Sequence, residues 1–504
     1  MSVKIYPVIK TAENCLDYRV FVNGQEVELN TARVSSQPYN RRWPGHQRQI
    51  DQTELVNFVS FAMERETEIV IIPKTLFSSV KIRPRRLNAE TMVRADGVIT
   101  VKLKQPSYFT VEPYGERCAL HVFADPMPNY DVDKNDSNVL YFGEGEHDAG
   151  VIELKSNQTL FLDEGAVVYA AVFAVDAENV RILGRGILDN GKNKEKILFD
   201  ASVENNSTAC NNADREHAIT LVGCKKVEID GITIRDSLLY NIDNISCEDV
   251  RIRNVKIIGS WRFNSDGIHF ANCINGSLTD CFIRTYDDAV CVRGYAQFEY
   301  DKWLKDKKEY LFECKNIRVK NCTIWNDWGK GMQIGTETYS SEISDIIFEN
   351  CNVIRVSFGA LYMWVVDCAK VRDILFHDID VEFDEYNRAP TIQPMDDAIY
   401  TYQYDANFSA PFIAFSIEKH FEYSMTKKES EIGSIRDVRL KNIRFYALQK
   451  PTFVFAGFSD TSRCENISLE GIYWNGEPIS QSLFESATSM NEYCFDIRLS
   501  NEAR

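Results

Sequence analysis

A short unit of alternating apolar and polar residues recurs along most of this chain. In the copy that runs from Cys247 to Ile257, apolar side chains occupy alternate positions and a polar bend lies at Asn254. A period of two is typical of a β-strand with one buried face, so each copy predicts two short strands joined by a bend. Further copies begin at Cys224, Cys273, Cys314, Ile343, Val371, Ile435 and Cys464, and a looser copy spans Glu178 to Leu188.

The spacing of these copies predicts how they stack. Most successive starting positions differ by 23 to 29 residues, and two differ by 41 and 64 residues. One unit cannot bury its apolar face alone, whereas a stack of units, one to a coil, buries a continuous column. The pattern therefore predicts a single-stranded parallel β-helix. The two longer steps are coils that carry insertions, Tyr295 to Phe312 and Phe383 to Ala414.

The N-terminal part of the chain lacks this unit. It contains short alternating stretches such as Tyr18–Val22 and Val98–Leu103, with turn signals at Asn23-Gly24 and Asp96-Gly97. Several strands without a helical pattern indicate a small β-sandwich packed against the first coils. We therefore expect an all-β protein with a β-sandwich-like domain over residues 1–135 and a parallel β-helix domain over residues 136–504.

The composition is acidic and argues against some classes of partner. The chain has 57 Lys and Arg against 74 Asp and Glu, which gives a net charge of −17. Phosphate binding needs clustered cations, so no nucleic-acid or membrane partner is expected. No window approaches the roughly 18 apolar residues of a membrane helix, and the first residues lack a signal-peptide pattern. We expect a cytoplasmic location, or secretion if a leader has been removed; the oligomeric state stays open.

The cysteines fit the repeat better than a metal or redox site. The chain has 14 Cys, and none forms a CxxC pair. Small polarizable side chains stacked in a dry column explain cysteines at equivalent repeat positions. The first position of the unit is shared by Cys224, Cys247, Cys273, Cys314 and Cys464. We expect no cofactor and no metal.

Three carboxylates stand at the joints of neighbouring units. They are Asp266, in Asn264-Ser265-Asp266-Gly267, and the pair Asp287-Asp288. Asp266 and Asp287 are 21 residues apart, which is close to one coil. The spacing therefore predicts that they lie on adjacent coils, within about 5 Å along the stacking direction.

Such a cluster suits the hydrolysis of a glycosidic bond. Like charges raise at least one carboxyl pKa, which leaves a protonated acid beside ionised bases. The acid protonates the leaving oxygen and a carboxylate activates water. A separation of roughly 6.5–9.5 Å between them leads to inversion. Turn aspartates also cap strands, and clustered aspartates also bind Ca²⁺, so the spacing alone leaves these alternatives open.

The region from about Gly231 to Asp378 resembles glycoside hydrolase family 28, the polygalacturonase-type right-handed parallel β-helix enzymes. Four motifs occur in the order that this family shows. They are Ser237-Leu-Leu-Tyr240-Asn241-Ile242, Asn264-Ser265-Asp266-Gly267-Ile268, Asp287-Asp288-Ala-Val-Cys-Val-Arg293-Gly294 and Gly329-Lys330-Gly331-Met-Gln333-Ile334-Gly335-Thr-Glu337. The resemblance implies a carbohydrate substrate, Asp287 as the general acid, and Asp266 and Asp288 as the residues that hold and activate water, without a metal.

The chain departs from the family pattern at two places. Lys330 stands where the family has a histidine, and no Arg or Lys occurs in Gly359–Trp364, where the family carries an Arg-Ile-Lys that holds the galacturonate carboxylate. Recognition of a carboxylate needs such a cation. Tyr362 and Trp364 can instead stack on a sugar face. The two-part layout is also similar to the dextranase-type family 49, which takes neutral glucans.

Other residues of these motifs are candidates for substrate contacts. They are Asn264, His269, Tyr286, Arg293, Lys330, Gln333 and Glu337, beside Tyr362 and Trp364. The insertion Tyr295 to Phe312, with Trp303, follows Asp288 and is expected to wall one side of the site, which favours an exo-acting enzyme. Two alternatives remain, a polysaccharide lyase or epimerase on the same fold, and a β-helix that binds glycans without catalysis.

Overall fold

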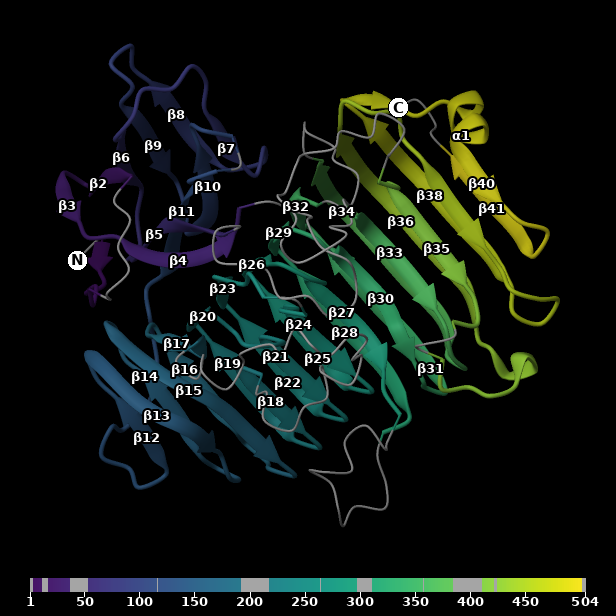
Figure 1. Cartoon of the computed structure of the whole chain (residues 1–504), viewed down its shortest axis with the longest axis horizontal. Coiled ribbons are helices and arrows are strands. Elements are labelled where there is room, and N and C mark those ends of the chain that lie inside the picture. Colours follow the sequence, from purple (N-terminus) through teal and green to yellow (C-terminus); the bar gives the residue numbers. More distant parts are fainter. Residues whose placement is uncertain are drawn as a thin grey trace, which may run out of the picture.

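The computed structural model describes residues 3–10, 17–36, 53–115, 117–191, 217–262, 264–296, 311–356, 358–383, 410–420 and 424–500. Within these residues nearly every element is a β-strand (Figure 1). No helix of the described residues has the length and apolar character needed to cross a membrane. The expectation of an all-β protein is confirmed.

The N-terminal strands form two antiparallel-rich sheets that share one core. One sheet contains β1 (Val3–Ile5), β4 (Asn30–Ser35), β5 (Thr53–Met63), β7 (Lys81–Arg83), β10 (Ser107–Glu112) and β11 (Leu120–Pro126). The other contains β2 (Tyr18–Val22), β3 (Gln25–Val27), β6 (Thr67–Pro73), β8 (Ala89–Val93) and β9 (Ile99–Leu103). Buried side chains of both sheets make a single hydrophobic cluster, which is the expected sandwich.

The remaining strands form one 30-stranded sheet that winds through the rest of the chain. A change of sheet therefore occurs between the end of β11 at Pro126 and the start of β12 at Val139. The predicted domain division after residue 135 falls in this stretch and stays a prediction.

The coil has three faces because a turn contributes three strands. Each strand pairs in parallel with the equivalent strand of the next turn. The first face contains β15 (Ala166–Val175), β18 (Ile219–Val222), β21 (Ile242–Ile245), β24 (Ile268–Ala271), β27 (Val290–Gly294), β30 (Lys330–Thr338), β33 (Gly359–Val365), β35 (Ile413–Ile417), β37 (Phe453–Ala456) and β40 (Thr488–Met490).

The second face contains β12 (Val139–Phe142), β14 (Thr159–Leu162), β16 (Arg181–Gly184), β19 (Lys225–Asp230), β22 (Glu248–Arg253), β25 (Ile274–Thr279), β28 (Glu313–Lys320), β31 (Glu342–Glu349), β34 (Lys370–Glu382), β36 (Ser434–Tyr446), β38 (Cys464–Trp474) and β41 (Cys494–Ser500). The third face contains β17 (Ile187–Asp189), β20 (Thr233–Arg235), β23 (Lys256–Ile258), β26 (Phe282–Thr285), β29 (Thr323–Asn326) and β32 (Asn352–Arg355), and ends on β34. Strand β13 (Gly145–Glu153), strand β39 (Glu477–Pro478), a 3₁₀ turn at Glu429–Glu431 and helix α1 (Gln481–Ala487) complete the coil.

This architecture is the parallel β-helix that the repeat predicts. The alternating apolar residues stack in register, as in the row Ile229, Ile252, Leu278 and Val319, and all of them are buried. The five cysteines at the first position of the repeat unit are also fully buried in this core. Stacking of equivalent side chains from successive coils buries one continuous column.

The predicted bends between the strands are real turns. Asn254, Asp280, Asn321 and Asn350 occupy equivalent corners with positive φ values of 53°, 55°, 57° and 52°. Asn and Asp tolerate this left-handed conformation better than other residues with a Cβ. The side chains also form a ladder, in which Asn321 donates to Asp280 at 2.9 Å and Asn350 donates to Asn321 at 2.7 Å.

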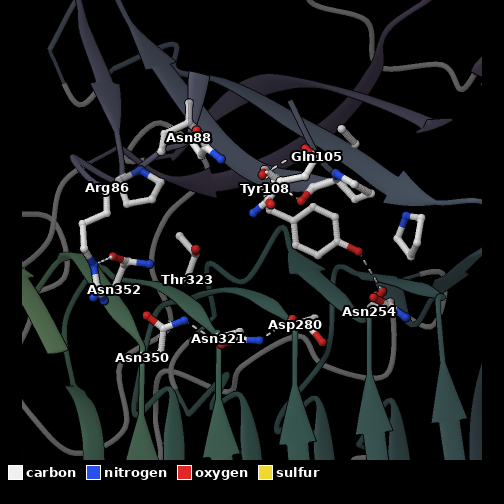
Figure 2. Close-up of a pocket in the computed structure, with 16 residues that line it drawn as sticks. Arg86, Asn88, Gln105, Tyr108, Asn254, Asp280, Asn321, Thr323, Asn350 and Asn352 are labelled. Carbon is white, nitrogen blue, oxygen red and sulfur yellow. Dashed lines mark hydrogen bonds between the residues drawn. The ribbon is translucent and has the colours of Figure 1, made fainter. Parts of the chain in front are cut away.

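The sandwich packs on the third face of the coil (Figure 1). Phe58 and Phe123 of the sandwich share a buried cluster with Phe282 and Trp325 of the coil. A cleft of about 550 Å³ remains beside this contact, between the Gln105–Tyr108 segment of the sandwich and the asparagine corners (Figure 2).

Candidate active site

The three aspartates lie on two adjacent coils at the start of strands of the first face. Strand β24 pairs with β27 in the register Ile268 to Val290, and β27 pairs with β30 in the register Val290 to Met332. Continuing this register by two residues places Asp266, Asp288 and Lys330 in one row. The backbone agrees, because Gly267 donates to the Asp288 carbonyl and Ala289 donates to the Lys330 carbonyl, each at 2.8 Å. The expected spacing of one coil is therefore observed.

The carboxylates form a buried cluster bridged by one cation. Asp266, Asp287 and Asp288 are 5%, 4% and 5% exposed. Arg293 Nη2 lies 3.6 Å from Asp266 Oδ2 and 3.8 Å from Asp288 Oδ2, and its Nη1 lies 3.2 Å from Glu337 Oε2. The guanidinium thus holds together carboxylates from three positions in the site.

Burial raises the pKa of both Asp266 and Asp287, but at Asp266 the neighbouring His269 and Arg293 act against the rise. At Asp287, burial and next the charges of Asp266 and Asp288 raise the pKa well above the usual range of a carboxyl, and Lys330 only partly opposes this. Asp287 Oδ1 accepts a hydrogen bond from the Asp288 amide at 2.9 Å. The loop at Gly329 lies so close that a Cβ there would come within 2.6 Å of this oxygen, so only glycine fits. A carboxyl with a raised pKa suits a proton donor at neutral pH.

Asp288 is held as an acceptor by the next coil. Its Oδ1 accepts from the Lys330 amide at 2.9 Å and lies 3.4 Å from Lys330 Nζ. With its amide turned so that the NH₂ group faces Asp288, Gln333 donates to this carboxylate and accepts from Thr336. The donors of the next coil thus fix the orientation of the Asp288 carboxylate.

The ammonium of Lys330 lies near three aromatic rings. Its Nζ lies 5.5 Å from the ring centre of Phe358 and 5.7 Å from those of Tyr362 and Trp364. Burial acts against its charge, but Asp288 and Asp287 outweigh this and raise the pKa of Lys330. The lysine that replaces the family histidine is thus a charged group directed at the two aspartates.

His269 is fully buried, and both of its ring nitrogens face carboxylates. Nε2 lies 3.1 Å from Asp266 Oδ2, and Nδ1 lies 3.4 Å from Asp243 Oδ1. The repeat contains a signal for Asp243 that the sequence analysis missed. Asp243 pairs with His269 in the register of β21 and β24, one coil earlier.

The other predicted contact residues surround this cluster. Tyr286 is buried and stacks on Trp328 with ring centres 6.2 Å apart, and Asn264 is buried in the turn before Asp266 with a φ of 52°. Tyr362 and Trp364 are half-buried, and the indole of Trp364 donates to Glu418 at 2.7 Å. Most of the insertions fall in residues 297–310 and 384–409, so Trp303 and the predicted wall lie outside the described residues.

One group of side chains has donor atoms close enough to share a cation. Asp266, His269 and Cys291 each offer one such atom, within 4.8 Å of one another. However, the Arg293 guanidinium lies 3.6 Å from the same Asp266 oxygen that His269 contacts, and this positive charge opposes a metal ion there. The absence of a metal stays a prediction.

The family comparison matches the region that carries this site. The sequence profile of the glycosyl hydrolases family 28 fits residues 145–386, which include all three aspartates and Lys330. The resemblance to family 28 is confirmed. The family 28 region thus covers β13 to β34, and it supports the expected enzyme class, a glycosidase.

Individual relatives match parts of the chain. An exopolygalacturonase of Arabidopsis thaliana is 32% identical over 142 residues, which are 25% of this chain and 33% of the relative. A polygalacturonase of Gossypium barbadense is 22% identical over 334 residues, 64% of this chain and 67% of the relative. For the first three relatives the match spans only 33%, 28% and 22% of the relative's length.

The fold of the whole chain is similar to that of Dex49A from Penicillium minioluteum. The TM-score is 0.60 at 14% identity, and the match covers 95% of this chain and 94% of the other. The similarity therefore extends over both the sandwich and the coil. It confirms the expected likeness in layout to the dextranase-type proteins, and at this identity it concerns the fold alone.

Proposed function

We propose that the protein is an inverting glycoside hydrolase in which Asp287 is the general acid and Asp266 and Asp288 activate water. The observation that carries this proposal is the contrast within the carboxylate cluster. Asp287 has a strongly raised pKa, whereas Asp288 accepts hydrogen bonds from the next coil, and at Asp266 the neighbouring His269 and Arg293 oppose the rise in pKa that burial causes. Carboxyl groups in such different environments take the acid and base roles of glycoside hydrolysis.

The reaction needs one proton transfer on each side of the scissile bond. Asp287 gives its proton to the glycosidic oxygen as the bond from this oxygen to the anomeric carbon breaks. Water attacks the opposite side of that carbon and gives a proton to Asp266 or Asp288, so the product has the inverted configuration. Release of the proton to solvent and its return to Asp287 restore the enzyme.

The charges around the site and the relatives support two classes of sugar. Arg293 is already engaged with three carboxylates and Lys330 with Asp288, and β33 contains neither Arg nor Lys. This supports a neutral α-glycan, because a uronate carboxylate needs its own cation. The similarity to polygalacturonases supports a pectin-type substrate. We include exo action in the proposal because the insertion that begins at Tyr295 follows β27, the strand directly after Asp288.

The test is a screen of the purified protein on labelled α-galacturonides, α-glucans and rhamnose-containing pectin fragments, with and without EDTA. We expect saturated products of inverted configuration by NMR. Asp287→Asn should lower the rate about 10²- to 10⁴-fold, the usual contribution of a general acid. The matched control is Asp280→Asn, at an exposed corner of the coil.

Three other outcomes would contradict the proposal. Products with retained configuration would exclude the inverting mechanism. Unsaturated products that EDTA abolishes would indicate a lyase. Glycan binding without turnover, unchanged in Asp287→Asn, would indicate a binding protein.

A further inference from the structure

His269 lies behind the carboxylate cluster, where a substrate cannot reach it. Its side chain is 0% exposed, and its two ring nitrogens face Asp266 on one side and Asp243 on the other. Asp243 is itself 0% exposed, and its second oxygen lies 3.4 Å from His217 Nδ1. The side chains thus form a row His217, Asp243, His269 and Asp266 that ends at the cluster.

The charges in this row support one another. Burial acts against the charge of His269, and Arg293 does so too, but the neighbouring carboxylates of Asp243 and Asp266 outweigh both and raise the pKa of His269 well above its usual value. Burial likewise acts against the charge of Asp243, and His269 outweighs it, which lowers the pKa of Asp243. Two carboxylates around one imidazole therefore stabilise the imidazolium.

Other groups face this imidazole from the elements packed around it. Strand β27 contributes Cys291 and Arg293, and the residues that follow it contribute the Tyr295 hydroxyl, 3.4 Å from His269 Nδ1. The ring of Tyr240 packs on His269 with centres 4.5 Å apart. Arg293 is the cation in this set, so the imidazolium depends on the two carboxylates.

The two oxygens of Asp266 have different surroundings. Oδ2 accepts from His269 and lies next to Arg293. Oδ1 is buried and has no hydrogen-bond partner among the described residues. One oxygen is therefore held by the protein, while the other is an acceptor with no hydrogen bond among the described residues.

We propose that His269, fixed by Asp243, is a positioning residue that holds Asp266 by Oδ2 and so presents Oδ1 to the attacking water. This inference rests on the proposed function. It adds Asp243 to the site and gives His269 a role other than the substrate contact expected from the sequence. Burial raises the pKa of Asp266, and the contact with His269 opposes this rise and so favours the ionised form that accepts a proton from water.

The first experiment reads the imidazole directly and needs no activity. The chain has seven His, so NMR of protein with ¹⁵N-labelled histidine resolves few ring signals, and His269→Gln identifies the one that matters. We expect His269 to keep its proton well above the pH at which an ordinary histidine loses it, and Asp243→Asn to move its titration to lower pH. A His269 that titrates near the ordinary value of about 6.5 would overturn the proposal.

The second experiment uses the pH dependence of kcat/KM, whose acid limb reports the ionisation of the essential base. His269→Gln removes a cation beside Asp266, so the acid limb should move to higher pH by about 1 unit. Asp243→Asn should move it in the same direction by less. A purely structural role would lower the activity without moving this limb.

The matched control is His377→Asn, which removes a histidine that faces a carboxylate, Glu349, at 3.5 Å on the second face. Its profile should equal that of the wild type, and thermal melting of every variant checks the fold. A wild-type protein without any glycosidase activity would contradict the proposed function, while the NMR titration would still decide whether Asp243 and His269 are coupled. An unmoved acid limb in an active, folded His269→Gln would refute the positioning role alone.

Discussion

Lys330 shows how one side chain sets the working pH of the proposed site. Its ammonium lies 3.4 Å from Asp288 and lowers the otherwise raised pKa of Asp287. A charged lysine next to a general acid makes the acid easier to ionise, so the proton is available for transfer over a narrower range of pH. The aromatic rings around Nζ keep this charge away from bulk water and so strengthen its effect.

We therefore predict that Lys330→Met moves the basic limb of kcat/KM to higher pH by about 1 unit. The limb falls where Asp287 loses its proton, and removal of the lysine charge raises the pKa of Asp287 further. The rate at the optimum should fall, because Asp288 loses one of its donors. A pH–rate profile measures both effects. Lys320→Met, which breaks the pair with Glu349 on the second face, is the control. A downward shift would contradict the assignment of the acid.

The asparagine corners show how one kind of turn recurs from coil to coil. Asn321 has a φ of 57°, donates to Asp280 and accepts from Asn350, so it serves both the turn and the ladder between coils. The two contributions differ physically. The backbone conformation favours Gly or Asn, whereas the ladder needs the amide.

We predict that Asn321→Ala destabilises the coil by about 2 kcal/mol and that Asn321→Gly does so by about 1 kcal/mol. Both variants lose the ladder, but only alanine adds the cost of a left-handed turn. Melting temperatures of the two variants, with hydrogen exchange of β28 and β31, measure the difference. Equal losses would mean that the ladder alone matters at this corner.

At the scale of the whole molecule, buried ion pairs connect the sandwich to the third face of the coil. Lys256 of β23 lies 3.0 Å from Asp125 of β11, and the two side chains are 1% and 0% exposed. Tyr108 donates to the same carboxylate, and Arg185 lies 3.7 Å from it. Removing one partner of such a pair leaves a buried charge and costs about 3–5 kcal/mol.

We predict that Lys256→Met destabilises the protein and that the loss grows as the pH rises above 8. Burial lowers the pKa of Lys256 to about 8. The unfolded chain keeps this proton up to the usual lysine pKa, so folding releases a proton in that interval and the stability of the wild type increases with pH. Melting temperatures of the wild type and the variant from pH 7 to 10 measure the gap. A gap that narrows would contradict the prediction. The double variant Asp125→Asn, Lys256→Met should recover part of the loss.

The sequence alone determines the coil, its corners and the meeting of the aspartates. A parallel β-helix joins each unit mainly to its neighbours, so a period of two within units and a spacing of 22 residues are enough to place Asp266 beside Asp288. The same register contained Asp243, one coil before His269. Asp243 was not recognised in the sequence because no motif marks its position. Its role follows only from the structure, in which the two ring nitrogens of His269 face Asp243 and Asp266.

Other properties were decided only by the tertiary structure. The role of a carboxyl in the proposed mechanism depends on burial and on charges from several coils, as the raised pKa of Asp287 shows. Arg293, expected to contact substrate, is engaged with three carboxylates because its strand faces the turns of both neighbouring coils. The docking of the sandwich joins Asp125 to Lys256, 131 residues apart in sequence. The repeat pattern describes contacts between neighbouring coils, so it does not predict a contact between the coil and the sandwich.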